Sequence, residues 1–249
     1  MSFRDLHYGE RPLVLPNAWD VGSALAFLEA GYPAIGTTSF GVGASAGHTD
    51  GSRSARAETR ALVARLVALP CFITADVEDG YSDDPAEVAD YVAGLGVAGV
   101  NLEDSTAGML VDPRVHAAKV AAVKERDPDV FVNARVDTYW FGQDIPATLE
   151  RALSYVDAGA DGVFVPGAIG RDALRELTRA VPVPVNVLPV LPLDELAGLG
   201  ARRVSTGSLP YRAAIDTAVA VAAAIRDGRP APAATPYPDM QARLARFGS

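Results

Sequence analysis

The sequence predicts an α/β fold: a single (β/α)8 TIM-type barrel with an additional C-terminal helical tail. Eight short apolar segments with strand character alternate with stretches of helical spacing, an order typical of parallel βαβ units. Three of the segments end on polar clusters that lie about 30 residues apart, which suits one strand and one crossover helix per step. Eight such units favour a closed barrel over an open sheet.

The predicted strands are short apolar runs. They are residues 13–15, 34–37, 72–75, 99–102, 131–134, 162–165, 185–188 and 203–205. The stretches between them carry apolar residues at helical spacing and often end at Gly or Pro, which predicts helices. These helices are residues 21–30, 55–68, 85–95, 115–125, 148–158 and 172–180.

The chain continues beyond the last predicted strand. Residues 213–226 predict an Ala/Val/Ile-rich helix that is hydrophobic on nearly all sides. A Pro-rich linker at 228–236 follows, and then a short amphipathic helix at 240–247. We therefore expect the barrel to comprise residues 1–227, and the linker and tail helix to comprise residues 228–249.

Composition limits the classes of partner. The net charge is −9 and no Lys/Arg-rich run occurs, so nucleic acid and anionic membranes are poor candidates. A small anionic substrate would then need positive charge from an arginine or a metal. The sequence has no basic-then-apolar leader and no uninterrupted apolar run of about 18 residues, so we expect a cytoplasmic protein.

Acidic residues follow predicted strands 3 and 4 where these strands end. Asp76, Glu78 and Glu103 should meet there, because parallel strands present their carboxyl ends at one mouth of a barrel. Carboxylate oxygens suit Mg²⁺ or Mn²⁺, for which one or two protein carboxylates suffice when water and substrate complete the octahedron. Helix capping is the alternative, but Asp76 and Glu103 lie at strand ends and not at helix starts.

Arg135 lies at the end of predicted strand 5. Its fork of donors matches a carboxylate bidentately and would anchor an anionic substrate opposite the metal. A salt bridge to Asp137 or to a neighbouring carboxylate is the alternative. Residues 36–43 offer hydroxyls and backbone donors that suit a carboxylate or phosphate, although small residues also make ordinary βα turns.

These segments together resemble the isocitrate lyase and phosphoenolpyruvate mutase superfamily, in its smaller-subunit, function-unassigned branch. The resemblance covers nearly the whole chain, from residue 15 to residue 207. Members of the superfamily are barrels that bind Mg²⁺ and a 2-oxo acid or its enolate, and that cleave or form C–C or P–C bonds. The phrases that carry the resemblance are Thr37-Thr38-Ser39, Gly80-Tyr81-Ser82-Asp83-Asp84-Pro85, Asn101-Leu102-Glu103-Asp104-Ser105 and Asn133-Ala134-Arg135-Val136-Asp137.

The resemblance implies roles for individual residues. Asp76 and Glu103 match metal-site acids, and Asp50 matches an acid just behind the metal ligands. Arg135 and Asp50 are accordingly the candidate catalytic residues. The candidate substrate-binding residues include the carboxylate-binding turn and polar residues on strands 4 and 7; the full set is Thr38, Ser39, Asn101, Arg135 and Asn186.

The chain also departs from the superfamily pattern. Residues 105–112 replace the loop that carries the catalytic cysteine in the lyases, so the resemblance implies a carbon–carbon lyase that does not depend on cysteine. The lysine- and asparagine-bearing loop of mutases and phosphonopyruvate hydrolases is missing there too. Thr74 replaces the first acid of the Asp-x-Asp pair, and we expect Glu78 to reach back to the metal instead. Alternatively, Glu78 is a solvated loop residue or pairs with Arg135.

The leading hypothesis is a Mg²⁺-dependent enzyme that acts on a small 2-oxo or 2-hydroxy carboxylate through an enolate, by C–C cleavage or decarboxylation. Phosphonate P–C chemistry and a catalytically silent metabolite-binding barrel are the alternatives. In relatives the C-terminal helix crosses to a partner barrel. The resemblance therefore implies a homo-oligomer, a dimer or tetramer, with residues 213–226 at the interface.

Overall fold

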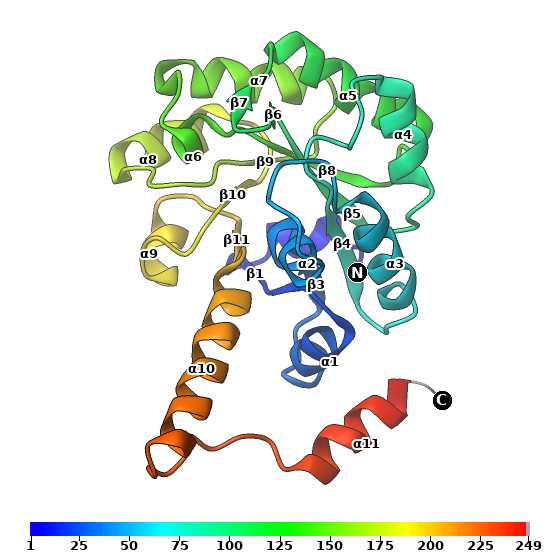
Figure 1. The fold of residues 1–249 in the computed structure, drawn as a ribbon. Helices are drawn as coiled ribbons and strands as arrows, with labels where there is room; N and C mark the ends of the chain where they lie inside the picture. The colour runs from blue at the N-terminus through cyan, green and yellow to red at the C-terminus, as the bar shows by residue number, and fades with distance from the viewer. Residues whose placement is uncertain (248–249) are drawn as a thin grey trace.

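In a computed structural model, which describes residues 1–247, the chain forms a parallel sheet of nine strands surrounded by helices (Figure 1). The predicted barrel is confirmed, and the seven strands from β3 onward coincide with predicted ones to within one or two residues. They are β3 (Ala34–Thr37), β4 (Phe72–Asp76), β5 (Gly99–Glu103), β8 (Phe131–Arg135), β9 (Gly162–Phe164), β10 (Val185–Val187) and β11 (Arg203–Ser205).

The first predicted strand, residues 13–15, is confirmed as β1, and an unpredicted two-residue strand, β2, follows it after Pro16. β1 (Leu13–Leu15) pairs with β11, whereas β2 (Asn17–Ala18) pairs with β3. Proline has no N–H to donate, so the hydrogen-bond ladder changes partner at this residue. Because β1 and β2 are the two edges of the sheet order and one residue joins them, the sheet closes into a barrel.

Helices surround the sheet, and the six predicted between strands are all present. They are α1 (Val21–Glu29), α3 (Arg56–Leu66), α4 (Pro85–Ala93), α5 (Pro113–Arg126), α7 (Thr148–Asp157) and α8 (Arg171–Ala180). α4 and α5 begin in the same way: an aspartate caps the first turn and proline is the first helical residue. The capping residues are Asp84 and Asp112, whose side chains accept from the backbone N–H groups of Ala86 and Arg114.

Short elements that the sequence did not predict lie between the predicted ones. Those that bear on the mouth of the barrel are α2 (Ser39–Ser45), α6 (Thr138–Phe141) and a hairpin of β6 (Ser105–Thr106) with β7 (Met109–Leu110), and α9 (Leu193–Gly198) precedes β11. Each is too short to show a clear hydrophobic period. α2 forms because the Thr38 side chain caps it, accepting from the Gly41 N–H.

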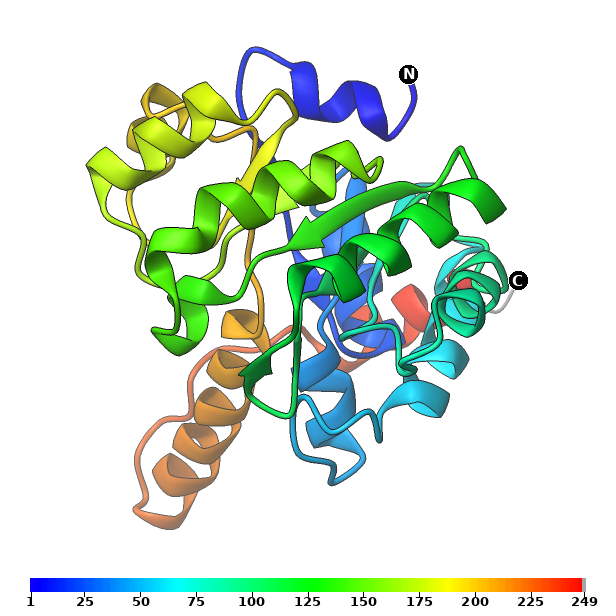
Figure 2. The same cartoon turned by 90° about the horizontal axis from the view of Figure 1, so that it is seen from above.

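Aromatic residues close the amino-terminal end of the barrel. The turn η1 (Arg4–Tyr8) places His7 flat against Phe131, with 4.3 Å between ring centroids, and Phe3 meets the same ring edge-on at 5.5 Å. In Figure 2 this deep-blue turn lies at the opposite end of the molecule from the hairpin β6–β7 and the orange helix α10. The open end of the barrel therefore faces the loops that follow the strands.

The tail consists of α10 (Leu209–Arg226) and α11 (Tyr237–Phe247). α10 begins at residue 209, ahead of the predicted start at 213, and both views show it extending away from the barrel. Most residues of α10 are exposed, and Val219 is 64% exposed. α11 returns to α1, where Arg243 and Arg246 pair with Glu29. Within residues 1–247, no helix has the length and apolar character needed to cross a membrane.

Candidate active site

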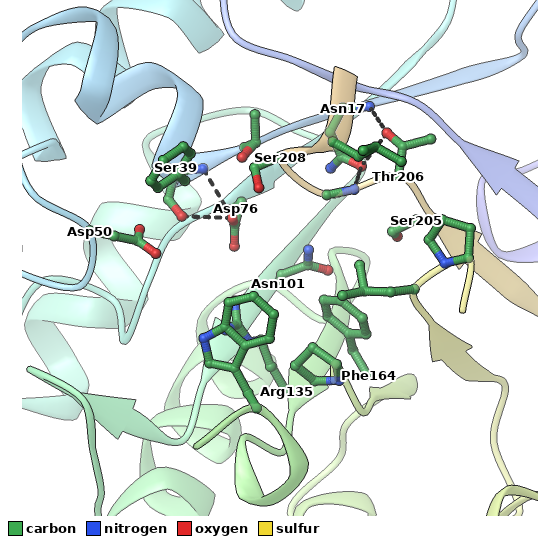
Figure 3. A pocket seen from close by; sticks show the side chains of 18 of the residues that line it. Asn17, Ser39, Asp50, Asp76, Asn101, Arg135, Phe164, Ser205, Thr206 and Ser208 are labelled. Atoms are coloured by element: carbon green, nitrogen blue, oxygen red, sulfur yellow. Dashed lines mark hydrogen bonds between the residues drawn. The ribbon is translucent and has the colours of Figure 1, made fainter. Parts of the chain in front are cut away.

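A cavity of about 490 Å³ opens at the carboxyl ends of the strands, where enzymes with this fold place their chemistry (Figure 3). We call it the mouth cavity. Its walls come from the loops after the strands and from the first turn of α10. The polar and charged residues that line it are Asn17, Thr38, Ser39, Asp50, Asp76, Asn101, Arg135, Ser205, Thr206, Ser208 and Arg212.

Asp76 ends β4 and lies on one wall of this cavity. Its Oδ2 accepts from the Ser39 backbone N–H at 3.0 Å and from the Ser39 hydroxyl at 2.8 Å (Figure 3). Its Oδ1 is buried and has no partner in the described part of the chain. The predicted turn at Thr38 and Ser39 therefore lies at the cavity, but the backbone N–H and the hydroxyl of Ser39 both donate to Asp76. One oxygen of Asp76 remains available for a ligand.

Arg135 ends β8 and bridges two carboxylates. Its Nη1 donates to Glu103, and its Nε donates to Asp137 at 2.5 Å. The guanidinium also lies over the rings of Trp140 and Phe164, at 5.6 and 5.8 Å from their centroids. The salt bridge that was the alternative to substrate binding is present, yet Nη2 binds no acceptor among residues 1–247. Arg135 is thus held in a fixed orientation with one nitrogen left for a substrate.

Glu78 and Glu103 line a smaller cavity of about 180 Å³, which we call the acidic cavity; Asp50 and Arg135 line both cavities. β4 and β5 pairing continues past the end of β4, because the Glu103 N–H donates to the Glu78 carbonyl at 2.8 Å. Glu78 has a left-handed backbone, with φ of 49°. Its carboxylate accepts from the Arg53 N–H at 2.9 Å, so Glu78 is neither a solvated residue nor the partner of Arg135.

Three acids at the mouth, Glu78, Glu103 and Asp50, have raised pKa values. Burial raises the pKa of Glu78 to about 7, and the nearby Asp76 and Asp50 add to the rise. Burial also raises the pKa of Glu103, and burial together with Asp76 raises that of Asp50. Repulsion among these acids would fall if a cation lay between them. In the described chain, however, no three such side chains are arranged ready to hold a metal, so the predicted ligand set stays a prediction.

Two other predicted residues occupy different depths. Asn101 lines the mouth cavity. Asn186 lies below the lining, where its Nδ2 donates to the Ser205 hydroxyl at 3.0 Å, so it reaches the cavity only through Ser205. Asp104, next to Glu103, is a structural residue. It accepts from Tyr155 at 2.7 Å and from Arg151 at 3.0 Å, and it binds the Asp137 backbone N–H.

Several residues at the site were not predicted. Asn17 and Thr206 bond across the seam between β2 and the loop after β11, and their hydrogen-bond distances are 2.9 and 3.2 Å. Trp140 and Arg212 come from α6 and α10, whose starts the sequence did not show. Trp140 follows the end of β8 by five residues and belongs to no recognisable motif, and Arg212 lay outside the predicted helix. Only their position in the fold brings them to the cavity.

Comparison with known proteins places the chain in a family. The phosphoenolpyruvate phosphomutase family profile matches residues 3–226. An uncharacterized protein of Mycobacterium tuberculosis is 57% identical, over 99% of this chain and 97% of its own length. The 2-methylisocitrate lyase of Escherichia coli is 31% identical, over 78% of this chain and 73% of the enzyme.

A solved structure extends the comparison of the fold. It is a phosphonopyruvate hydrolase in complex with oxalate and Mg²⁺, with a TM-score of 0.80 and 22% identity, over all of this chain and 98% of the hydrolase. At that identity the likeness concerns the fold. The profile match covers residues 3–226, which is most of the sequence, and agrees with the barrel. The chain belongs to the phosphoenolpyruvate phosphomutase family, within the isocitrate lyase and phosphoenolpyruvate mutase superfamily.

Proposed function

We propose that the protein is a Mg²⁺-dependent lyase that acts on a small 2-oxo or 2-hydroxy carboxylate, by C–C cleavage or decarboxylation through an enolate. The observation that carries the proposal is the arrangement at the mouth cavity. Arg135 is fixed on one wall, and Asp76 lies on another with an unpartnered oxygen. A compact anion with oxygens at both ends would meet a cation on one side and a metal-binding carboxylate on the other.

The donor set supports Mg²⁺. Asp76 Oδ1 is a buried carboxylate oxygen without a partner in the described residues, and such an atom is costly unless a cation or donor satisfies it. Asp76 would hold the ion directly, and Glu78 and Glu103 would hold it partly through water, since Mg²⁺ commonly keeps several waters. The bound ion would supply positive charge to substrate oxygens as negative charge develops on them.

The protein's own groups have separable tasks. Arg135 would bind the substrate carboxylate and orient it, because its other nitrogens are fixed by Glu103 and Asp137. Trp140 and Phe164 would exclude water from that end of the substrate. Asp50 lines both cavities, and its raised pKa suits a group that returns a proton to the carbon left by bond cleavage.

Relatives support the reaction class and do not name the substrate. Oxaloacetate, phosphonopyruvate and 2-methylisocitrate should each be assayed with the purified protein, with and without Mg²⁺. We expect turnover of a C–C substrate that is abolished by a chelator and restored by Mg²⁺. Release of phosphate from phosphonopyruvate alone would replace the proposal with P–C chemistry. Ligand binding without any turnover would make the protein a metabolite-binding barrel.

The metal ligands need a separate test. Glu78→Gln and Glu103→Gln preserve size and remove charge, so both should weaken Mg²⁺ binding by comparable factors in calorimetry. Glu150→Gln, on the outer helix α7, is a matched control that should leave Mg²⁺ binding unchanged. Wild-type Mg²⁺ affinity in Glu78→Gln, with loss in Glu103→Gln, would remove Glu78 from the proposed set.

A further inference from the structure

An arginine is buried inside the barrel beneath the mouth cavity. Arg203, on β11, is 1% exposed. No carboxylate lies within salt-bridge distance of it in the part of the chain that the structure describes, although the charge of Asp76 acts on it from further away, and its Nη1 has no hydrogen-bond partner there. An unpaired guanidinium in a barrel interior costs stability unless other groups compensate for its burial. The groups that can compensate for the burial of Arg203 are therefore its remaining hydrogen-bond partners.

Its remaining bonds reach two residues that line the cavity. Nη2 donates to Asn101 Oδ1 at 3.1 Å, and Nε donates to the Ser205 hydroxyl oxygen at 3.0 Å. Figure 3 shows both side chains at the mouth cavity, with Asn101 near the centre of the view and Ser205 to its right. We call this pair the cavity floor. Arg203 itself does not line the cavity, so its influence on a ligand would pass through these two side chains.

Arg203 determines which end of the Asn101 amide faces the ligand. Arginine can only donate hydrogen bonds, so the amide oxygen must face Arg203. Asn133 Nδ2 donates to the same oxygen at 2.8 Å, which reinforces this orientation. The amide NH₂ of Asn101 is then turned toward the cavity, where it is a donor.

Ser205 is constrained in the same direction. Its hydroxyl oxygen accepts from Arg203 Nε and from Asn186 Nδ2, each at 3.0 Å. With both lone pairs used, the hydroxyl proton is left to donate to another group. Ser205 lines the mouth cavity, so that acceptor would be a ligand oxygen.

We propose that the cavity floor is a two-donor site for a substrate oxygen, and that Arg203 is the positioning residue that sets both donors. The ligand class is a carbonyl or carboxylate oxygen of a 2-oxo acid, held at the floor while Arg135 holds another carboxylate oxygen at the wall. The site would discriminate against a substrate that presents a hydrogen-bond donor at this position, because an unpaired buried donor is costly. The substrate class rests on the proposed function; the donor geometry does not.

The test uses oxalate as the probe, titrated calorimetrically into the full chain with Mg²⁺ present. Asn101→Ala and Ser205→Ala should each weaken oxalate binding by about 10-fold or more, the size expected for one lost bond to a charged acceptor. Ser154→Ala is the matched control. It removes a serine hydroxyl on the outer helix α7, away from the mouth cavity, and oxalate affinity should change less than twofold.

Arg203→Lys tests the positioning role. One ammonium group should not reproduce the fork that reaches both floor residues, so oxalate binding should weaken about 10-fold. In a protein that already carries both Asn101→Ala and Ser205→Ala, adding Arg203→Lys should weaken oxalate binding by less than a further twofold. The reason is that Arg203 acts through those two side chains. A lower melting temperature with wild-type oxalate affinity would mean a purely structural arginine and would overturn the role.

The outcomes separate this inference from the proposed function. Wild-type oxalate affinity in Asn101→Ala and Ser205→Ala would overturn the floor site, whether or not Arg203→Lys folds. An equal loss in Ser154→Ala would also overturn it. Floor variants that lose oxalate binding, in a protein that turns over no 2-oxo acid, would support the floor site and reject the lyase. A wild-type protein that binds no oxalate would reject both.

Discussion

The two ends of the barrel have opposite effects on the stability of the fold. At the closed end, η1 packs Phe3 and His7 on Phe131, and burial lowers the pKa of His7 to about 3, so His7 is neutral there. At the open end, burial raises the pKa of Glu78, and charged Arg135 lies beside two acids. The closed end gains stability from apolar contacts. The open end keeps charges close together at a cost in stability, which is characteristic of binding and catalytic sites.

The largest expected effect is on the closed end. Phe3→Ala removes a buried ring that touches His7, Phe72 and Phe131, and should lower the free energy of unfolding by about 3–5 kcal/mol. Oxalate affinity should stay at the wild-type value, because Phe3 is remote from the mouth. Urea denaturation and calorimetry measure the two quantities. A large loss of oxalate binding in the folded variant would mean that the two ends are coupled.

The converse experiment is at the open end. Arg135→Lys replaces a fork fixed by Glu103 and Asp137 with a point charge, so oxalate binding should weaken by about 1–3 kcal/mol. Arg126→Lys, whose arginine pairs with Asp90 on the outer helices, is a suitable control and should bind oxalate normally. Unchanged oxalate affinity in Arg135→Lys would show that Arg135 serves only its two carboxylates.

The strands were predictable, whereas the short elements at the mouth were not. Runs such as Phe131–Arg135 are buried along almost their whole length, so they read as apolar segments in any context. The hairpin β6–β7 has two-residue strands and turns at Ala107 and Gly108, both with positive φ, and it is held by contacts from distant segments. Such an element depends on tertiary contacts, which a local pattern does not contain.

The site residues also fall into predictable and unpredictable ones. Asp76, Glu103 and Arg135 were identifiable because each lies at the carboxyl end of a strand. Arg203 was not, because an arginine that begins a three-residue strand reads as a surface position; its burial follows from closure of the barrel. Whether Glu78 binds metal remains a prediction. The structure does show that its carboxylate is held by the Arg53 N–H.

A smaller effect concerns pH. Glu78 has a pKa of about 7 in the folded protein against 4.5 ordinarily, so between these values the folded state keeps a proton that the unfolded chain has lost. Its contribution to stability is therefore present below about pH 4.5 and is lost as pH rises through 7. In the absence of Mg²⁺, Glu78→Gln should remove this pH-dependent loss in the free energy of unfolding, which is on the order of 2 kcal/mol.

The difference between wild type and Glu78→Gln is the quantity to measure, by urea denaturation from pH 5 to 8. His7 and His116 have lowered pKa values, so their contributions change in the opposite direction over part of this range. They cancel in the difference between the two proteins. Parallel stability curves for the two proteins would contradict the assignment of a proton to Glu78.

The smallest effect on the site is expected from α10. This apolar helix extends from the barrel with Ile215, Val219 and Ile225 at least half exposed, and we propose that it is covered by a second subunit. Val219→Asp should dissociate a dimer or tetramer in light scattering, while oxalate affinity changes by less than about 0.5 kcal/mol. A wild-type monomer at micromolar concentration would reject the proposed assembly.

The most direct test of the central claim is a crystal structure with Mn²⁺ and oxalate, in which Mn²⁺ stands for Mg²⁺ and is located by its anomalous scattering. The proposal predicts one metal peak bonded to Asp76 Oδ1, with oxalate in the mouth cavity between the metal and Arg135. A metal peak elsewhere, or oxalate bound away from both Asp76 and Arg135, would contradict a metal-dependent 2-oxo acid site at this end of the barrel.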